Sequence, residues 1–269
     1  MAKLDDHTAS EASKILLIGP NGGGKSGALV SLARAGYNLR ILDCDNGTEI
    51  IKQLLKNDPQ EVRDRVDIET HNDDYVLQPG TNRLVPKTPL AFGKAMECLN
   101  KWPGLGSPTT WGTDTVLVVD SLTMLGKMIL AHVMQMAGKP GEQPSQPNWG
   151  TAMDLQENLL AMLFSKSIKC HVIVTAHVTY IQGEGEIQTK GYPSALGNKL
   201  PPKVGSYFNS TLLMSFEGAG TNKKRVLRTA PTQNIDTKTP APGKVKDTYP
   251  IETGLADYFK DLHGPLKKS

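Results

Sequence analysis

A glycine-rich segment near the N-terminus has the residue types and spacing of an anion-binding loop. It reads Gly19-Pro20-Asn21-Gly22-Gly23-Gly24-Lys25-Ser26, which matches the pattern G-x-x-x-x-G-K-[ST]. Glycines let the backbone turn tightly and aim its N–H groups at an anion, and the N-terminus of a following helix adds a favourable dipole. We predict that this phosphate loop, together with Gly27, binds the phosphates of a nucleotide. The alternative is a glycine-rich loop that contains Lys-Ser by chance.

Three side chains could complete such a site. Lys25 would reach the β- and γ-phosphates as a movable point charge, and Ser26 would offer a hydroxyl to Mg²⁺, which prefers oxygen ligands. Asp120 follows the apolar run Val116–Val119, and the carboxyl end of a buried parallel strand is where ligands bind. We expect Ser26 and Asp120 to hold Mg²⁺, with Asp120 acting through water. The alternative is that Asp120 only caps the helix that begins at Ser121.

A second pair of carboxylates follows another apolar run. Asp43-Cys44-Asp45 ends the predicted second strand, at the same edge of the sheet. One of the two carboxylates could orient the attacking water or accept its proton. Because side chains alternate along a strand, Asp43 and Asp45 are expected on one side and Cys44 on the other. The alternative is a pair of aspartates that cap a loop.

The elements that must position these residues alternate in type. Short apolar runs separated by segments of helical periodicity predict an α/β fold with a parallel sheet. The predicted strands are Lys14–Ile18, Leu39–Asp43, Val66–Thr70, Thr115–Val119, His171–Thr175, Ser210–Phe216 and Arg225–Arg228. The predicted helices are Lys25–Ala35, Pro89–Trp102, Ser121–Met136 and Thr151–Lys166. Glycine and proline content predicts long loops at Ala137–Asn148 and Tyr180–Lys199, and irregular structure at Thr232–Thr248.

Composition excludes several classes of protein. The chain has 269 residues, 38% hydrophobic and 21% charged, with a net charge of +3, which is typical of a soluble globular chain. No apolar run approaches the ~18–20 residues of a membrane span, and the N-terminus lacks the apolar segment of a signal peptide. Cys44, Cys98 and Cys170 fit neither a disulfide framework nor a zinc spacing. We expect a protein of the reducing cytosol with no membrane partner.

The order of the motifs resembles the RecA-like recombinase core. The phosphate loop is followed by Asp-x-acid, and then by Val116–Leu122 (VLVVDSL), which is similar to the metal-binding strand of that family. The chain resembles most the short phage-encoded ATPases of the AAA type, among them phage single-strand annealing proteins with a shortened recombinase core. The resemblance implies a RecA-like P-loop NTPase fold, with a mostly parallel central sheet flanked by helices and a late β-hairpin. It implies a short tail (1–13), a RecA-like ATPase core (14–235) and a C-terminal extension (236–269) that packs on or beyond the core.

The resemblance also implies roles for two further residues. In RecA-like proteins a glutamate after the second strand activates water, and Asp45 occupies that position with a side chain one methylene shorter. The water must then shift, or hydrolysis is slow. The family's fifth strand ends in a polar sensor, usually an Asn-Gln pair, that couples the γ-phosphate to a DNA-binding loop. That pair is absent here, and His177 stands at the glutamine position. The alternative is an ordinary histidine at a strand end.

A basic stretch lies late in the chain. Residues 221–246 hold seven basic residues against Asp236, a net charge of +6, which favours a polyanion. By the resemblance, such residues contact DNA or reach the ATP of a neighbouring subunit. The candidates for these contacts are Lys223, Lys224, Arg225, Arg228 and Lys238. The alternative is a solvated charged hairpin. The resemblance also makes 137–148 and 180–199 the DNA-facing loops, in which Tyr180 and Tyr192 could stack on bases.

Together these features predict an ATP- and Mg²⁺-dependent ATPase that acts on single-stranded DNA in phage recombination or annealing. The predicted catalytic residues are Lys25, Asp45, Asp120 and His177. The expected partners are single-stranded DNA, further copies of the chain in a ring or filament, and a single-stranded-DNA-binding protein, all in the cytosol of a bacterial host. The alternatives are a P-loop accessory of phage DNA replication and, less favoured because no Arg-rich lid is evident, a small-molecule kinase.

Overall fold

A computed structural model describes residues 11–80, 83–182 and 189–266 of the chain. The main sheet is built from β1 (Lys14–Ile18), β2 (Asn38–Asp43), β3 (Val66–Thr70), β6 (Thr115–Asp120), β7 (His171–Ala176), β10 (Ser210–Glu217), β11 (Lys224–Arg228) and β12 (Thr248–Pro250). Two separate hairpins pair β4 (Tyr75–Gln78) with β5 (Arg83–Pro86) and β8 (Val178–Gln182) with β9 (Thr189–Pro193). The helices are α1 (Lys25–Ala28), α2 (Val30–Arg34), α3 (Glu49–Leu54), α4 (Gln60–Arg63), α5 (Ala91–Asn100), α6 (Leu122–Met136), α7 (Gln146–Phe164), α8 (Pro201–Val204) and α9 (Gly254–His263).

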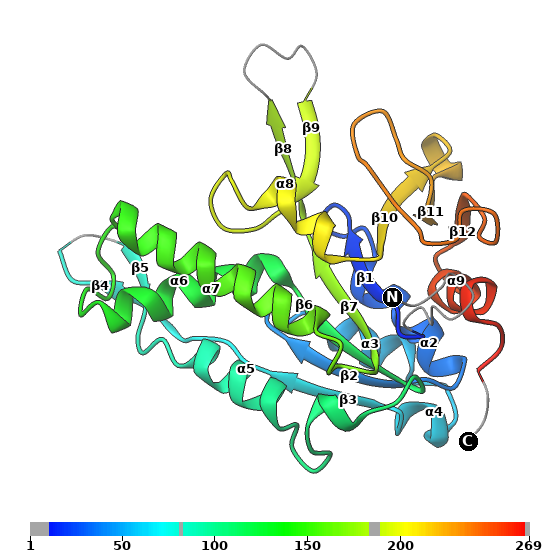
Figure 1. Cartoon of the computed structure of the whole chain (residues 1–269), viewed down its shortest axis with the longest axis horizontal. Helices are drawn as coiled ribbons and strands as arrows, with labels where there is room; N and C mark the ends of the chain where they lie inside the picture. The colour runs from blue at the N-terminus through cyan, green and yellow to red at the C-terminus, as the bar shows by residue number, and fades with distance from the viewer. Residues whose placement is uncertain (1–10, 81–82, 183–188, 267–269) are drawn as a thin grey trace, which may run out of the picture.

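The main sheet has the order β12-β11-β10-β1-β7-β6-β2-β3 (Figure 1). Neighbours from β10 to β3 are all parallel, whereas β11 pairs antiparallel with both β10 and β12. The predicted mostly parallel sheet with a late hairpin is therefore confirmed. The carboxyl ends of β1, β2, β6 and β7 meet at one edge, because these strands are parallel and adjacent.

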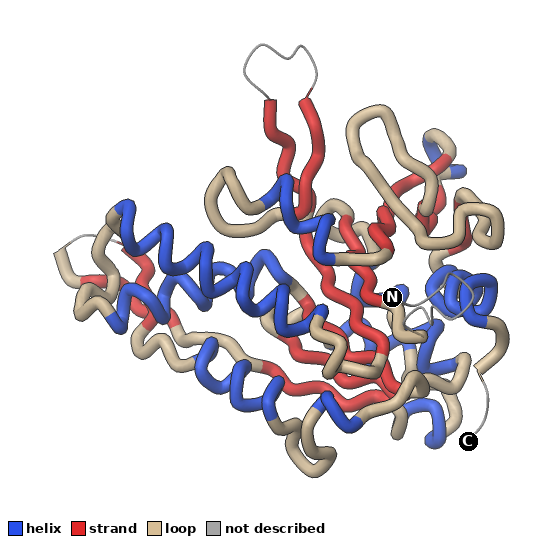
Figure 2. Tube along the Cα trace, viewed as in Figure 1, coloured by secondary structure: helices blue, strands red, loops and turns tan. Residues whose placement is uncertain are grey.

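Helices cover both faces of this sheet (Figure 2). Along β1, Leu16 and Ile18 join the hydrophobic cluster that includes residues of α5, α6 and α7, whereas Ile15 and Leu17 join the cluster that includes residues of α1, α2 and α9. All four side chains are at most 1% exposed. Burial on both faces explains why this strand is apolar without alternation.

The predicted loop at 137–148 is wrong at its C-terminal end, because α7 begins at Gln146 rather than Thr151. The N–H and the hydroxyl of Ser145 both donate to Asn148 Oδ1, at 3.2 and 2.5 Å, which fixes the start of the helix. Pro147 lies in the first turn, where its missing N–H costs nothing. A proline that suggested a loop thus belongs to the helix.

The predicted long loop at 180–199 is also wrong over most of its described residues. Strands β8 and β9 pair antiparallel from Val178↔Pro193 to Gln182↔Thr189, and the hairpin projects away from the main sheet (Figure 1). Position 191 in β9 requires a glycine, because a Cβ there would stand 2.7 Å from Ile235 Cγ1; this glycine marks a close approach to another segment rather than a loop. The residues 183–188 lie outside the described part of the chain.

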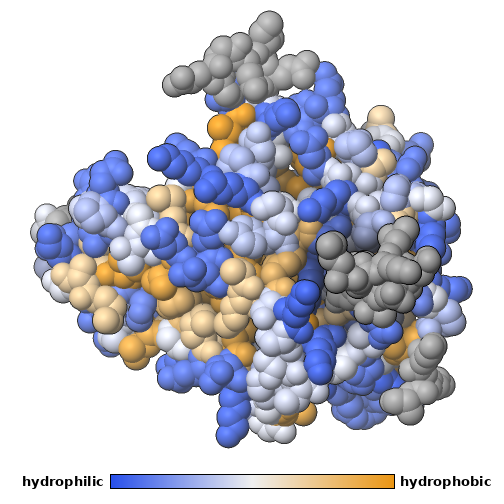
Figure 3. Space-filling view, in the orientation of Figure 1, coloured by the Kyte–Doolittle hydropathy of each residue, from blue (hydrophilic) through white to orange (hydrophobic). Residues whose placement is uncertain are grey.

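The surface is mostly polar on the face seen in Figure 3, with apolar side chains gathered toward its left side. On the β4–β5 hairpin, Leu77 and Leu84 are cross-strand partners and are 64% and 67% exposed. We call these two residues the hairpin pair. Among the described residues, no helix has the length and apolar character needed to cross a bilayer.

The three cysteines are buried and form no disulfide. Burial raises the pKa of the Cys98 thiol to about 12, and it also raises the pKa of Cys44 and of Cys170. Since the thiolate is the reactive form, these side chains act as small core residues.

His171 is a neutral histidine held at the start of β7. Its Nδ1 accepts a 2.9 Å hydrogen bond from the Ser13 N–H, and its ring meets Phe259 edge-on, with His263 5.1 Å away. Burial, with a smaller contribution from His263, lowers the pKa of His171 to about 3. A proton on Nδ1 would remove the acceptor for Ser13.

We therefore expect the protein to lose stability in mild acid through His171. The unfolded chain binds the proton first, at a pKa of ~6.5, so the contribution of His171 is complete above that pH and is lost as pH falls toward 3. At pH 5 the expected loss is about 2 kcal/mol. Urea unfolding at pH 7 and pH 5 measures it. His171→Asn keeps an acceptor for Ser13 and should flatten the pH dependence; an equal loss in that variant would contradict this origin.

Candidate functional site

The phosphate loop connects β1 to α1 at the carboxyl edge of the sheet. Gly22 and Gly24 have φ values of 66° and 93°, in the left-handed region that favours glycine. A Cβ on Gly24 would also stand 2.3 Å from Ile251 Cδ1. The backbone conformation therefore favours glycine at both positions, and the contact with Ile251 leaves no room for a side chain at Gly24.

The Lys25 side chain folds back over this loop. Its Nζ donates to the carbonyl oxygens of Gly19 and Pro20, at 3.1 Å each. Burial lowers the pKa of Lys25, while the nearby carboxylates of Asp120 and Asp45 oppose that shift. Both hydrogen-bond acceptors are neutral, so the positive charge of the ammonium remains available to an anion.

Ser26 and Asp120 are in direct contact. Ser26 Oγ donates to Asp120 Oδ2 at 2.6 Å, and Thr175 Oγ1 donates to the other carboxylate oxygen at 2.5 Å. Asp120 is 3% exposed; burial raises its pKa, and the two hydrogen bonds oppose that rise. A hydroxyl and a carboxylate side by side are oxygen donors of the kind that Mg²⁺ prefers, so these residues fit the predicted metal.

The two aspartates after β2 have different surroundings. Asp43 is 1% exposed; its Oδ1 accepts from the Asp45 N–H at 3.0 Å and its Oδ2 from Thr48 Oγ1 at 2.8 Å. Asp45 instead reaches the residue after β6, where its Oδ1 accepts from the N–H and hydroxyl of Ser121, at 3.1 and 2.8 Å. The expectation that both face one way is wrong, because β2 ends at Asp43 and alternation stops there. Asp43 caps the turn, and Asp45 lines the cleft.

His177 follows β7 directly and lines the same cleft. Its N–H donates to Thr123 Oγ1 at 3.1 Å, and its carbonyl accepts from the Ser194 N–H at 2.7 Å. Burial lowers the pKa of His177, and the charge of Lys25 adds to that effect. The imidazole is therefore held neutral beside the phosphate loop, with its backbone tied to α6 and to the segment after β9.

These residues border one cleft of about 570 Å³. Its lining comprises Gly22, Gly24, Lys25, Ser26, Gly27, Val30, Arg34, Asp45, Ile50, Leu54, Asp120, His177, Arg225, Ile251 and Glu252. All four predicted catalytic residues are among them. The structure also adds apolar side chains from α2, α3 and the connection between β12 and α9.

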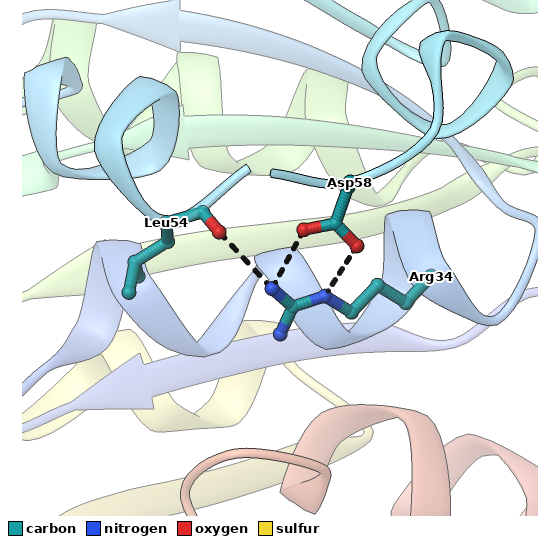
Figure 4. A network of polar contacts seen from close by, with 3 residues as sticks. All are labelled: Arg34, Leu54 and Asp58. Carbon is teal, nitrogen blue, oxygen red and sulfur yellow. Dashed lines mark hydrogen bonds and ion pairs between the residues drawn. The ribbon is translucent and has the colours of Figure 1, made fainter. Parts of the chain in front are cut away.

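Arg34 fixes one wall of the cleft. Its guanidinium donates to both Asp58 carboxylate oxygens, at 2.9 and 2.8 Å, and to the Leu54 carbonyl at 3.1 Å (Figure 4). This network ties the end of α3 to α2. Because the charge of Arg34 is compensated by Asp58, its contribution to the cleft is mainly its hydrocarbon stem.

The five basic candidates have different surroundings. Lys223 Nζ lies 4.4 Å from the centre of the Phe216 ring, Arg228 pairs with Glu217 at 2.5 Å, and the backbone of Lys238 bridges to Thr211. Lys224 is exposed on β11. Among the five, Arg225 alone lines the cleft, where its Nε donates to the Gly22 carbonyl at 3.2 Å.

Sequence reasoning missed several residues of the site. Thr175 had a signal, because it is a polar residue inside an apolar strand next to the one that ends in Asp120. No sequence signal marked Ile251 and Glu252, since they belong to a short strand-to-helix connection without a motif. Their place beside the phosphate loop depends on how β12 joins the sheet.

Comparison with known proteins identifies a family. The AAA domain family AAA_24 matches residues 11–241. The chain belongs to this family. With the phosphate loop and the mostly parallel sheet described above, this AAA domain is an AAA-type P-loop ATPase.

Solved structures of low sequence identity also match the AAA domain. A KaiC-like protein from Pyrococcus horikoshii OT3 is 10% identical, with 91% of this chain and 87% of that chain covered and a TM-score of 0.43. The flagellar accessory protein FlaH from Methanocaldococcus jannaschii is 11% identical (90% and 88% covered, TM-score 0.45). The RadB recombinase is 15% identical (86% and 85% covered, TM-score 0.42). No curated protein sequence matches the chain.

The different surroundings of Asp45 and Asp43 lead to a paired prediction. Asp45→Asn keeps an acceptor for Ser121 but removes the charge that would orient water, so turnover should fall by about 10²-fold or more while nucleotide affinity is kept. Asp43→Asn should instead lower the free energy of unfolding by about 1–3 kcal/mol, since its amide cannot accept all the bonds of the carboxylate. Steady-state turnover and urea unfolding separate the two. Equal turnover in wild type and Asp45→Asn would remove Asp45 from the mechanism.

Proposed function

We propose that this AAA domain hydrolyses ATP with Mg²⁺ and uses its nucleotide state to control binding of single-stranded DNA, in phage recombination or annealing. The observation that carries the proposal is the convergence of Lys25, the Ser26–Asp120 pair and Asp45 in one cleft. A cation, a hard-metal donor pair and a separate carboxylate are the groups that phosphoryl transfer to water needs.

Each residue has a distinct task in this proposal. Lys25 and the N–H groups of the phosphate loop bind the phosphate chain, and Ser26 and Asp120 hold the metal. When bound, Mg²⁺ supplies neutralisation of the charge on the transferred group. Asp45 orients the attacking water or accepts its proton; Ser121 fixes the position of this carboxylate. His177, neutral at pH 7, donates an N–H to a phosphate oxygen.

The DNA part of the proposal is supported by the chain connection between His177 and a projecting hairpin. The next residue, Val178, begins β8, so the cleft and the β8–β9 hairpin are joined by one backbone. The hairpin presents Tyr180, 58% exposed, and the exposed Lys190. Tyr180 and Lys190 lie on opposite faces of the hairpin, because Tyr180 pairs with Gly191 and Lys190 pairs with Ile181. The exposed ring of Tyr180 alone offers a stacking surface to a base of a single strand. In this proposal, a change at His177 alters the position of the hairpin that begins at the next residue.

The oligomer part is supported by the exposed hairpin pair, Leu77 and Leu84. Adjacent large apolar side chains on a surface are typical of interaction sites. We propose that copies of the chain assemble into a ring or filament, and that a single-stranded-DNA-binding protein is a further partner.

The experiment compares ATP turnover alone, with a single-stranded oligonucleotide and with a duplex of the same sequence. We expect stimulation by the single strand only, and weaker DNA binding in Tyr180→Ala by fluorescence anisotropy. Turnover that no DNA affects, without DNA binding, would instead favour a P-loop accessory of phage replication. Light scattering with and without nucleotide and DNA measures the assembly.

A further inference from the structure

Arg225 lies along the phosphate loop from the direction of β11. Its Nε donates to the Gly22 carbonyl at 3.2 Å. Its Cδ stands 3.3 Å from where a Cβ on Gly24 would be, beside Ile251. The side chain therefore touches the loop at two glycines and borders the cleft.

The cations that line the cleft differ in whether a carboxylate compensates their charge. Lys25, Arg34 and Arg225 are the basic residues of the lining. Arg34 is bound by both oxygens of Asp58 (Figure 4). Arg225, in contrast, has no ion pair within the described part of the chain; besides Gly22, it lies near the Phe216 ring, 5.8 Å from its centre. A guanidinium carries five N–H donors in a planar fork, and a single bond from Nε leaves the Nη groups for an anion.

The scaffold that places Arg225 belongs to the same chain as the phosphate loop. Strand β11 pairs with β10, with Arg225 opposite Phe216, and β10 pairs with β1, which leads into the loop. On the far side of β11, β12 leads to Ile251 at Gly24. The position of the guanidinium is thus set within one subunit.

We propose that Arg225 is a phosphate-binding residue that acts in cis, its Nη groups binding the phosphate chain of the nucleotide in its own subunit. The inference rests on the proposed function and deepens it. It replaces, for this residue, the expected contact with DNA or with the ATP of a neighbour. Charge-assisted, bidentate bonds from arginine to phosphate are among the stronger hydrogen bonds in proteins.

The first test is nucleotide affinity, measured by titration with fluorescent MgATP and MgADP analogues. Arg225→Ala should weaken binding of at least one nucleotide by about tenfold or more, and Arg225→Lys should recover part of the loss. Arg63→Ala, an exposed arginine on α4, is the matched control and should bind as the wild type does. Unchanged affinity in Arg225→Ala overturns the inference. Wild-type protein that binds no nucleotide overturns the proposed function instead.

The second test separates cis from trans by mixing two variants at a nucleotide concentration at which each alone turns over more slowly than the wild type. Lys25→Ala keeps Arg225 but lacks the phosphate-loop lysine, and Arg225→Ala keeps the loop intact. If Arg225 acts in cis, the mixture shows only the summed turnover of its two components. Turnover restored well above that sum, through an Arg225 supplied by a neighbouring Lys25→Ala subunit, would overturn the cis assignment. Circular dichroism of each variant confirms that it is folded.

Discussion

Lys25→Ala is expected to lower ATP turnover by about 10²–10³-fold, the usual result of removing a preorganised group that stabilises charge at a transferred phosphoryl. The ammonium lies inside the phosphate loop, 3.1 Å from the carbonyl oxygens of Gly19 and Pro20. A short rotation of its flexible stem moves it from these acceptors to an anion. Alanine leaves the loop amides in place but removes this mobile charge.

The variant should fold as well as the wild type does. Burial already disfavours the charged form of Lys25, so its removal relieves a desolvation cost while two neutral carbonyls lose one donor. Turnover and thermal unfolding are measured together. Lys166→Ala, an exposed lysine after α7, serves as the control for a lost positive charge. Wild-type turnover in Lys25→Ala would remove the proposed site.

Asp120→Asn is expected to abolish the dependence on Mg²⁺ and to lower turnover by about 10²-fold or more. Asparagine has nearly the same size, and its oxygen can still accept from Ser26 or Thr175. It lacks the negative charge that a hard divalent cation requires. We therefore expect Asp120→Asn to lose metal binding while its fold is kept.

The measurement is nucleotide affinity with Mg²⁺ and with a chelator in its place. Wild-type protein should bind the nucleotide more tightly with the metal, and Asp120→Asn should bind it equally in both conditions. Asp154→Asn, an exposed carboxylate on α7, should behave as the wild type does. A full Mg²⁺ effect in Asp120→Asn would show that the metal is held elsewhere.

The parallel strands were predictable because their signal is local. The bounds of β1 and β3 coincide with the predicted Lys14–Ile18 and Val66–Thr70, since each run is bordered by residues that suit a turn or a helix. The β8–β9 hairpin was missed because its glycines also suit a loop. The contact with Ile235, from a distant segment, explains why this strand position is a glycine.

In the candidate site too, residues with a local sequence signal could be predicted, whereas those placed by contacts between distant segments could not. Lys25 and Ser26 come from a contiguous motif, so their place is set once a strand and a helix flank the loop. The residue types alone left Asp43 and Asp45 equivalent, and only the family resemblance favoured Asp45. The structure separates their surroundings through a hydrogen bond from Ser121 to Asp45 across the sheet. Arg225 likewise appears as one cation among several until the order β11-β10-β1 brings it to Gly22.

The burial of all three native cysteine thiols makes site-specific fluorescent labelling of this protein simple. Cys44, Cys98 and Cys170 should resist maleimide dyes in the folded state, so no cysteine-free background needs to be made first. A single engineered Lys190→Cys on the projecting hairpin would then carry a fluorophore alone. Its emission, recorded while nucleotide and oligonucleotide are added, would show whether that hairpin moves.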